Sequence, residues 1–381
     1  MPNSRISKAL DAGWLIVTGG AHQRGGQDRA NLELIRYLST EGTGRVDVVV
    51  HEVTPELESF RRVHLSRVAR PLGSTILGER LLEAAASRLQ RHLDPSTIVL
   101  ANGGNYRHAG VNWVHSVHAV WPVCDDDAPV HRRLVNRLKK ADARRRERTA
   151  VGAASVVIAN SERTADDLTR ALGVSPDRIA VVRFGSDPAV PSDADTAGSE
   201  RLVFVGALGW DRNKGLDVAL QALQLLVRGG DEKTTLTVAG PGTVEPWVAM
   251  TRRLGLEGRV HFVGAIDDVS ALLRTADLLV SPVRYEAYGL AIQEALVHGV
   301  PALVSANAGI VPLLRASAPQ LVVPDGSGPA VWAEAIAAAS RNSSQLRSVV
   351  AQLGANLAQR TWTAMASELV EQVDRRLLRR D

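Results

Sequence analysis

The chain has 381 residues, of which 45% are hydrophobic and 23% charged, a composition typical of a globular protein with room for two domains. Its one cysteine, Cys124, excludes an internal disulfide framework and a cysteine-based metal cluster. The N-terminus has no long apolar run, and the longest apolar stretch, 295–314, is interrupted by two prolines. We therefore expect neither a signal peptide nor a membrane-spanning helix, and we expect a cytoplasmic protein.

Charge is distributed unevenly along the chain. Residues 1–185 hold 27 Lys+Arg and 20 Asp+Glu, a net charge of +7, whereas residues 186–381 hold 18 and 21, a net charge of −3. The positive excess is concentrated in 131–148. Basic surface attracts phosphates, anionic lipid or nucleic acid, and the absence of aromatic interleaving or a nucleic-acid motif argues against nucleic acid. This segment predicts either a solvated helix or a peripheral contact with the inner face of an anionic membrane.

Strand-like and helical segments alternate through the first half of the sequence. Short apolar runs predict strands at 14–17, 46–50, 98–100, 111–118, 155–159 and 179–182. Helical spacing of apolar residues predicts helices at 27–41, 77–93, 130–150 and 162–172. This alternation predicts a parallel sheet with helices packed on it, which we assign to an N-terminal domain at 1–186.

A polar stretch rich in proline, glycine and serine at 187–200 predicts an interdomain linker. A second alternating series follows it, with strands at 202–205, 236–238, 260–263, 277–280 and 302–305 and helices at 215–228, 244–254 and 290–298. We assign a C-terminal domain at 201–361 and a final helix at 362–381 that crosses back to the N-terminal domain. Two doubly wound domains bind their ligand at the carboxyl ends of their strands, in the cleft between them.

A glycine-rich loop follows the first predicted strand. Gly25 and Gly26 stand just before a helix, where glycine lets the backbone approach a phosphate closely. The spacing is not the Gly-x-Gly-x-x-Gly pattern of dinucleotide sites, which disfavours a nicotinamide cofactor. The alternative is a tight turn between strand and helix.

Two histidines, His115 and His118, lie in the predicted strand at 111–118. Residues three apart in a regular strand point to opposite faces, so the pair is not expected to bind one metal. A histidine at the carboxyl end of a strand can hydrogen-bond a ligand there. The alternative is a structural role for each.

A lysine stands at the second domain's first strand-to-helix junction. The chain has only five lysines against forty arginines, and one of them, Lys214, precedes Gly215 there. A cation beside a helix N-terminus suits a diphosphate leaving group, whose charge grows as the bond breaks.

The segment 284–296 contains two carboxylates separated by seven residues, Glu286 and Glu294. If a helix begins near Gly289, Glu286 lies in the loop before it and Glu294 on its second turn. The N–H groups at Gly289 and Leu290 then form an anion site between the two acids. This arrangement predicts a nucleotide-sugar site; the alternative is a helix-start acid and a solvated helix face.

In order along the chain, these motifs resemble those of the retaining glycosyltransferases of family 4, which have the GT-B fold. The resemblance covers roughly residues 14–373 and is strongest over 201–305. It implies two Rossmann-like doubly wound domains facing each other across a cleft. It also implies that Glu286 binds hydroxyls of the donor sugar and Glu294 the ribose, with Tyr288, Gly289 and Leu290 beside the donor.

The same resemblance assigns roles to the remaining motifs. Lys214 would bind the diphosphate, and the backbone at Gly264 would contact the base. Many family members carry arginine where this chain has Ala207. Either Arg212 or Arg24 replaces that charge, or the donor is bound more weakly than in those members.

In the N-terminal domain the resemblance is weaker. Gly25 and Gly26 would face the donor diphosphate and the acceptor, and His118 would lie beside the reacting carbon.

The expected function is therefore the retaining, metal-independent transfer of a sugar from a UDP-, GDP- or TDP-linked donor to an acceptor hydroxyl that the sequence does not identify. No cofactor is expected, and 125–127, a run of three aspartates, is interpreted as a solvated loop rather than a metal site. Two alternatives stay open. One is a GT-B epimerase or phosphorylase, and the other is a non-catalytic subunit that binds a nucleotide sugar or a partner.

Overall fold

The computed structural model describes residues 7–190 and 200–378. The chain divides into two compact units. The first unit comprises Met1–Trp121, His131–Gly185 and Thr361–Asp381, and the second comprises Pro122–Val130 and Ser186–Arg360. Within the described ranges, no helix combines the length and the apolar character needed to span a bilayer.

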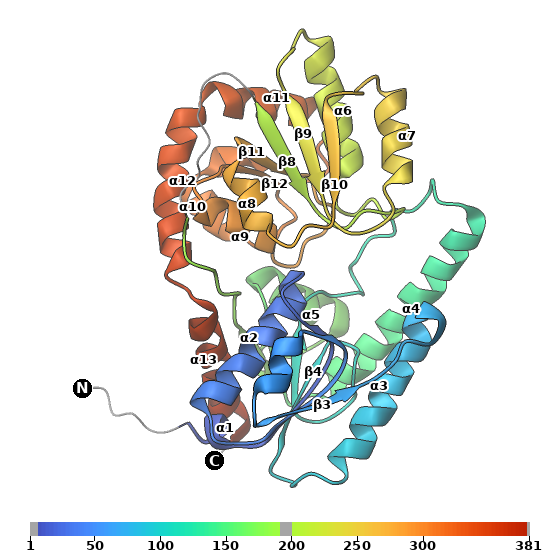
Figure 1. Cartoon of the computed structure of the whole chain (residues 1–381), viewed down its shortest axis with the longest axis vertical. Helices are drawn as coiled ribbons and strands as arrows, with labels where there is room; N and C mark the ends of the chain where they lie inside the picture. The colour runs from blue at the N-terminus through green and yellow to red at the C-terminus, as the bar shows by residue number, and fades with distance from the viewer. Residues whose placement is uncertain (1–6, 191–199, 379–381) are drawn as a thin grey trace. The chain divides into compact units, whose positions relative to one another are not determined.

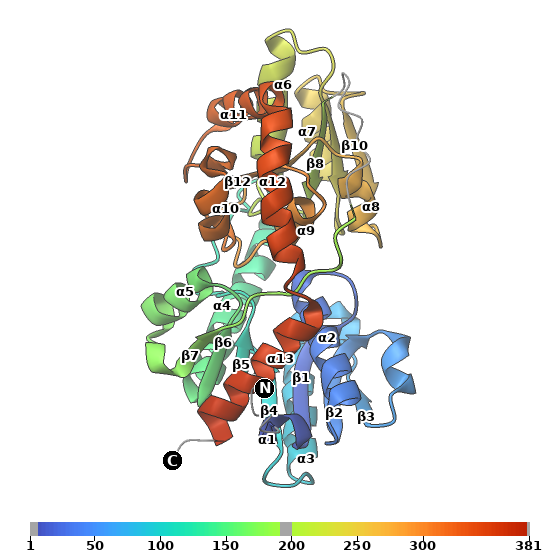
Figure 2. The same cartoon turned by 90° about the vertical axis from the view of Figure 1, so that its left-hand side faces the viewer.

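The first unit is built on a seven-stranded parallel sheet in the order β3-β2-β1-β4-β5-β6-β7. Its strands are β1 (Trp14–Ala21), β2 (Val46–Val53), β3 (Val63–Arg67), β4 (Ile98–Asn102), β5 (Val111–Val114), β6 (Val156–Ala159) and β7 (Ile179–Val181). Its helices are α1 (Lys8–Asp11), α2 (Gly26–Glu41), α3 (Thr75–Gln90), α4 (Val130–Ala153), α5 (Glu162–Leu172) and α13 (Trp362–Val373). Figures 1 and 2 show α2 and α13 on one face of this sheet, with α3 and α4 on the other.

Local sequence explains where these elements begin and end. Residues 14–17 of β1 are all buried, as expected for a central parallel strand that is covered on both faces. The side chain of Ser161 accepts the N–H of Thr164 and so caps the start of α5. Gly173 ends that helix in the left-handed conformation, which glycine adopts without steric cost.

The second unit is built on a six-stranded parallel sheet in the order β10-β9-β8-β11-β12-β13. Its strands are β8 (Arg201–Val205), β9 (Thr235–Ala239), β10 (Val260–Gly264), β11 (Leu278–Ser281), β12 (Ala302–Ser305) and β13 (Val322–Val323). Its helices are α6 (Leu216–Arg228), α7 (Glu245–Arg253), α8 (Val269–Arg274), α9 (Leu290–Val297), α10 (Val311–Ser317), α11 (Pro329–Arg341) and α12 (Ser343–Ala358). One continuous apolar core joins both faces of this sheet to the helices.

The predicted domain limits differ from the two units chiefly at one segment, with shifts of one residue at Ser186 and Thr361. Residues 122–130 were assigned to the N-terminal domain, but they group with the second unit. The N–H of Arg212 donates to the carbonyl of Cys124 over 2.8 Å, and the Arg212 guanidinium pairs with Asp127. These contacts attach the loop to the second unit. Of the predicted linker at 187–200, residues 191–199 lie outside the described part of the chain.

One predicted strand is shorter than expected. The run at 111–118 forms a strand only as far as Val114, so His115 and His118 both lie in the loop that follows. The argument that the two side chains alternate across a strand was therefore wrong. The loop leaves the sheet because the carbonyl of His118 and the N–H groups of His118 and Ala119 bond to side chains of α4 instead of a neighbouring strand.

Candidate functional site

Both sheets reverse their strand order at one point, and this point is where doubly wound folds bind ligands. In the first unit the reversal lies between β1 and β4, and in the second between β8 and β11. At each of these points the connections that follow the two neighbouring strands run to opposite sides of the sheet. A crevice therefore forms between them at the carboxyl ends of the strands. Most predicted site residues follow these strands, whereas His118 follows β5 and Gly264 ends β10.

In the second unit the structure brings Lys214 and Glu286 together. Lys214 follows β8 and precedes α6, and Glu286 follows β11 and precedes α9. The Nζ of Lys214 lies 2.5 Å from Oε2 of Glu286, although the residues are 72 positions apart. The pair is partly exposed, so a ligand can reach both groups. The sequence analysis named each of these residues as a candidate site residue, but it did not predict that they contact each other.

The loops that carry this pair are tied to each other by hydrogen bonds. Arg284 donates to both carboxylate oxygens of Asp217, over 3.0 and 2.7 Å, and this contact raises the pKa of the Arg284 guanidinium. The N–H of Arg284 donates to the carbonyl of Asn213, and the side-chain amide of Asn213 donates to the carbonyl of Tyr285, each over 2.8 Å. Lys214 and Glu286 are thus held on loops fixed by buried polar contacts.

The backbone around Glu286 is held on its other side by the turn that follows β12. The N–H of Glu286 donates to the carbonyl of Asn307 over 3.2 Å, and the Glu286 carbonyl accepts the N–H of Gly309 over 2.9 Å. Gly289 has φ +109° and caps α9, which starts at Leu290 as predicted. Helix starts leave their first N–H groups without intrahelical acceptors, and these groups favour an anion. Glu294 lies on the second turn of this helix.

Three further residues that were predicted to contact the donor, Tyr288, Arg212 and Gly264, differ in how far a ligand could reach them. Tyr288 is buried, and its hydroxyl donates to Gln293, so its side chain is part of the core and only its backbone can meet a ligand. Arg212 pairs with Asp127, so its guanidinium already has a carboxylate partner. Gly264 ends β10 with φ +71°, and its carbonyl accepts the N–H of Gly240 over 2.8 Å.

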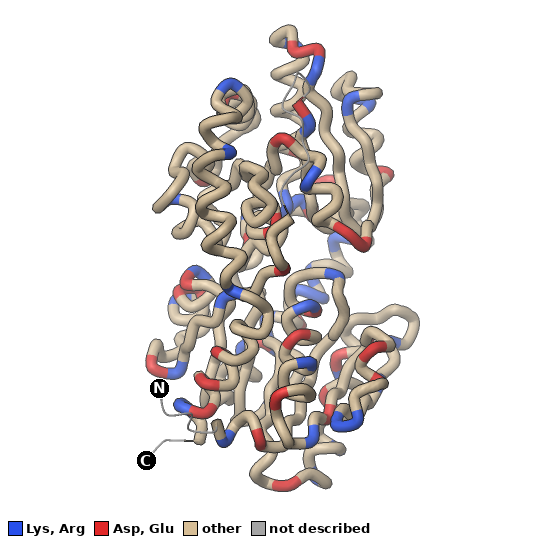
Figure 3. Tube along the Cα trace, turned by 60° about the vertical axis from the view of Figure 1, so that its left-hand side comes forward, with Lys and Arg blue, Asp and Glu red and all other residues tan. Residues whose placement is uncertain are grey.

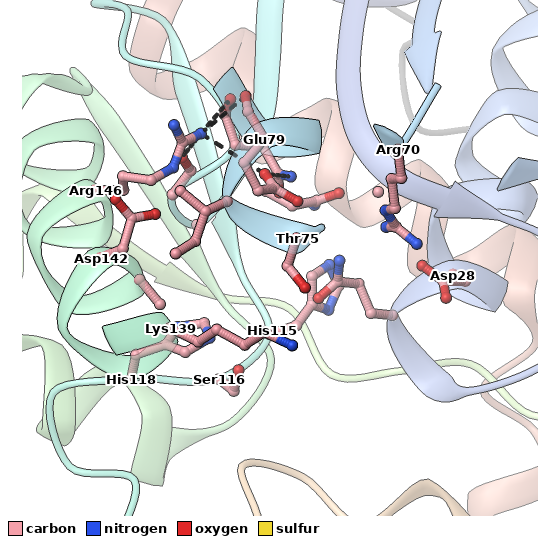
Figure 4. Close-up of a pocket in the computed structure, with 18 of the residues that line it drawn as sticks. Asp28, Arg70, Thr75, Glu79, His115, Ser116, His118, Lys139, Asp142 and Arg146 are labelled. Carbon is pink, nitrogen blue, oxygen red and sulfur yellow. Dashed lines mark hydrogen bonds and ion pairs between the residues drawn. The ribbon is translucent and has the colours of Figure 1, made fainter. Parts of the chain in front are cut away.

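The first unit contains a cavity of about 390 Å³ at the carboxyl ends of its strands, within the size range of small-molecule sites. It is lined by residues at or just after the ends of β1, β2 and β4, by residues that follow β3 and β5, and by residues of α2, α3 and α4. Figure 4 shows several of these side chains. Gly25 has φ +78° and caps α2, whose first residue is Gly26. Both predicted glycines therefore occupy a helix start in this unit.

His118 lines the same cavity and is oriented by a residue that the sequence analysis did not single out. Glu147 of α4 is fully buried, and its carboxylate accepts the N–H groups of His118 and Ala119 over 2.8 and 3.1 Å. Nδ1 of His118 lies 3.1 Å from the same carboxylate. Because a carboxylate only accepts, Nδ1 of His118 is the donor in this contact, and in a neutral imidazole Nε2 is then the acceptor. The signal in the sequence was a single acid within the arginine run at 144–148.

His115 also lines the cavity, but in a different state. It is 8% exposed and packs between the rings of Trp113 and Phe184, with centroids 4.5 and 5.6 Å away. Neither ring nitrogen has a hydrogen-bond partner. Burial lowers the pKa of His115 to about 3, so the imidazole is neutral at physiological pH.

The aspartate run at 125–127 lies in a loop, as predicted, and Asp126 and Asp127 are exposed there. Asp125 is buried, and Asp127 pairs with Arg212. Among the described residues, no group of three or more His, Cys, Asp or Glu side chains is arranged to hold a metal ion.

Two family models match the chain, one on each half. The model described as "Glycosyltransferase Family 4" matches residues 24–190, and that described as "Glycosyl transferases group 1" matches residues 199–342. In sequence, the chain is 26% identical to the "D-inositol 3-phosphate glycosyltransferase" of Corynebacterium diphtheriae, over 67% of this chain and 63% of that protein. It is 36% identical to the "Glycogen synthase" of Mycobacterium tuberculosis over 38% of this chain and 35% of that protein. The chain thus spans about three-fifths of the first relative and a smaller part of the second.

Solved structures share the fold over nearly the whole chain. WaaG, "a glycosyltransferase involved in lipopolysaccharide biosynthesis", has a TM-score of 0.73 at 19% identity and covers 94% of this chain and 99% of its own. HepE of Anabaena "in complex with UDP-glucose" has a TM-score of 0.68 at 19% identity, over 95% and 99%. The fold is therefore GT-B, composed of two Rossmann-like domains. Since a family model matches each half, the chain belongs to the glycosyltransferases of the family 4 type.

Proposed function

We propose that the protein transfers a sugar, with retention of configuration and without a metal ion, from a nucleotide-diphosphate sugar to an acceptor hydroxyl. The observation that carries this proposal is the contact between Lys214 and Glu286 beside the Gly289-capped start of α9. A cation, a carboxylate and an unsatisfied helix start at one switch point match a diphosphate joined to a sugar.

Each group of the second unit has a role in this proposal. Lys214 and the N–H groups of Gly289 and Leu290 bind the diphosphate and stabilise the charge that grows on it as the sugar departs. Glu286 accepts hydroxyls of the donor sugar, and Glu294 those of the ribose. Binding of the donor replaces the direct contact between Lys214 and Glu286 with contacts from each residue to the donor.

The chemical step is a front-face displacement. The acceptor hydroxyl attacks the anomeric carbon from the face that the nucleotide leaves, and the departing phosphate oxygen takes the hydroxyl proton. His118 lies beside the reacting carbon, with Nε2 as a hydrogen-bond acceptor. Catalysis then rests on positioning and on charge stabilisation.

The first test is thermal stability with UDP, GDP, TDP, ADP and CDP, each with and without EDTA. A ligand at about 100 times its dissociation constant adds roughly 2.7 kcal/mol of stability, which is measured as a melting shift. We expect one nucleotide to shift the melting temperature regardless of EDTA, and Glu294→Ala to abolish the shift. Glu334→Ala, which removes an exposed acid of α11 in the same unit, is the matched control and should keep it. No shift with any nucleotide would contradict the proposal.

The alternatives give different products. An epimerase would convert the nucleotide sugar without an acceptor, whereas a non-catalytic subunit would bind the nucleotide without turnover across a wide acceptor panel. HepE structures with UDP and with UDP-glucose support UDP as the first donor to test.

We further propose that the first unit contacts an anionic membrane through the N-terminal turns of α4. Val130, Leu134 and Leu138 are 73%, 59% and 58% exposed and follow one another at four-residue spacing, so they share one helix face. Arginines and lysines flank this face throughout 131–148. Figure 3 shows basic and acidic residues interspersed along the whole trace. An exposed apolar row beside basic side chains is the pattern of a helix that lies at a lipid interface.

Flotation with phosphatidylglycerol-containing vesicles tests this contact. We expect the protein to float with the vesicles, to be released by high salt, and to lose binding when Leu134 and Leu138 are both replaced by serine. Leu225→Ser, at an exposed leucine of α6, should bind as the unmodified protein does. Absence of salt-sensitive flotation would refute the contact.

A further inference from the structure

The loop at 122–130 groups with the second unit, although the chain continues into the first unit at both of its ends. The guanidinium of Arg212 pairs with the carboxylate of Asp127 in this loop, and the N–H of Arg212 donates to the carbonyl of Cys124 over 2.8 Å. Arg212 precedes Lys214 by two residues in the connection from β8 to α6. A segment remote in sequence thus places a carboxylate on a cation of the connection that also carries Lys214.

Arg212 lies among the charged groups of the second unit's switch point. Nη1 of Arg212 lies 4.0 Å from Oδ2 of Asp217, which is on the first turn of α6. Arg284 holds that carboxylate with two hydrogen bonds and also donates to the carbonyl of Arg212, two residues before Glu286. Arg284 thus occupies Asp217, and Asp127 supplies the carboxylate that the Arg212 guanidinium contacts. A guanidinium at this point suits the oxygens of a diphosphate.

The ion pair of Asp127 with Arg212 is exposed enough to open when a stronger anion arrives. The side chain of Asp127 is 61% exposed and that of Arg212 is 30% exposed. Such a pair adds little net stability, because water solvates both groups when they separate. A diphosphate carries more negative charge than one carboxylate and offers several oxygens to the guanidinium. Asp125 and Ala128 are buried and hold the loop backbone, so only the Asp127 side chain has to turn away.

We propose that Asp127 competes with the donor diphosphate for Arg212 and thereby lowers the affinity of the protein for its donor. The incoming diphosphate takes the guanidinium, and the Asp127 carboxylate turns into solvent. Glu286, which pairs with Lys214 before the donor binds, then accepts sugar hydroxyls, whereas Asp127 gains no new partner. The inference rests on the proposed function, in which the second unit binds the diphosphate.

The first experiment titrates the full chain with UDP in a calorimeter, or with GDP, TDP, ADP or CDP if the melting assay selects one of these. Asp127→Asn keeps the shape of the side chain but removes its charge, and it should lower the Kd about threefold, within the range of an exposed ion pair. Asp126→Asn removes the same charge from the adjacent exposed position, whose carboxylate is not the one that pairs with Arg212. This control should leave the Kd within about 1.5-fold. An unchanged or higher Kd in Asp127→Asn, or equal gains in both variants, would overturn the competition.

A second experiment combines substitutions at both ends of the ion pair. Arg212→Gln should raise the Kd at least about threefold, because a charge-assisted contact to the diphosphate is lost. In that background Asp127→Asn should no longer lower the Kd, since the two residues act through one contact. A gain that persists without Arg212 would overturn the competition, as would an unchanged Kd in Arg212→Gln. Failure of all five nucleotides to bind either the unmodified chain or Asp127→Asn would instead count against the proposed function.

Discussion

The two switch points have the same topology but are built differently at close range. In the second unit, glycines let backbone segments touch: a Cβ at Gly215 would lie 1.9 Å from the carbonyl oxygen of Pro282, and one at Gly242 would lie 1.7 Å from that of Leu208. In the first unit, Gly25 and Gly103 also have positive φ, but a Cβ on either would meet nothing within 4 Å.

This difference separates two uses of glycine in one architecture. In the second unit glycine allows loops to pack against each other, which fixes Lys214 and Glu286 before any ligand arrives. In the first unit Gly25 and Gly103 leave room, whereas a Cβ at Gly20 would lie 2.7 Å from the side chain of Asp28, so side chains rather than backbone surround the cavity. The groups at the second unit's switch point are thus held by backbone packing, whereas side chains form the cavity of the first unit.

The largest effect is expected from changing the second unit's chemistry without changing its packing. Glu286→Gln keeps the shape of the side chain but removes its charge, so turnover should fall at least about 100-fold, as when a preorganised electrostatic contact is lost. The melting shift with nucleotide should stay nearly intact. Steady-state kinetics check this, with Glu245→Gln at an exposed position of α7 as control. Turnover close to that of the unmodified protein would exclude Glu286 from the reaction.

Replacing a closely packed glycine of the second unit and an unobstructed glycine of the first unit with alanine tests how differently the two are packed. Gly215→Ala should destabilise the second unit by about 3 kcal/mol or more, since φ is +79° and the new methyl group meets a carbonyl oxygen. Gly25→Ala should cost only about 1 kcal/mol, because it adds backbone strain without a clash. Urea unfolding measures both. Equal losses of stability in the two variants would show that the backbone at Gly215 moves away from Pro282 without cost.

Replacing Glu147 tests whether its side chain determines the position of His118 in the cavity of the first unit. Glu147→Ala leaves the N–H groups of His118 and Ala119 without their acceptor, a cost of about 1–3 kcal/mol, and frees the imidazole of His118. We expect turnover to fall about tenfold, with an altered pH profile. Glu147→Gln retains an acceptor oxygen and should recover most of the stability but not the pH profile. If Glu147→Ala lowers stability but leaves the pH profile of turnover unchanged, Glu147 has only a structural role.

The last prediction concerns acid stability, which should differ between the units. Burial lowers the pKa of His115 to about 3 and that of His108 to about 4, against an ordinary value of 6.5. Stability from these neutral histidines is complete above pH about 6.5 and is lost as pH falls, by about 1.4 kcal/mol per pH unit for each, because only the unfolded chain takes up the proton. Unfolding of His115→Phe between about pH 6 and pH 4.5 should show a shallower slope. An unchanged slope would mean that His115 already binds its proton in the folded state.

The sequence was sufficient to predict most of the fold, because buried parallel strands and amphipathic helices have strong local patterns. It also predicted the start of α9 at Gly289, since glycine before an apolar helical run is a local signal. The strand at 111–118 was overextended because an apolar run does not reveal that α4 captures its last residues. The strand β3 was not predicted, as it has only five residues of mixed polarity.

Site features that depend on long-range contacts were not predictable in the same way. The contact of Lys214 with Glu286, the bond of Arg284 to Asp217 and the burial of Glu147 each join residues far apart in sequence. The ion pair of Arg70 with Glu52 is likewise a property of the fold. Motifs could therefore indicate candidate site residues in the second unit, whereas the cavity of the first unit emerged only from packing.

Neither unit is a continuous piece of the chain, because the polypeptide passes from one unit to the other four times. The first unit is completed by α13, whose Trp362, Met365 and Leu369 are buried and whose Asp374 accepts the N–H of Ala9 over 3.0 Å. A fragment ending near residue 186 would leave the apolar surface under α13 open to solvent and should aggregate. To produce the two units of this protein separately, the C-terminal segment that contains α13 must be joined to the first unit. This requires a rearranged gene, because cutting the chain once would separate α13 from the sheet that it covers.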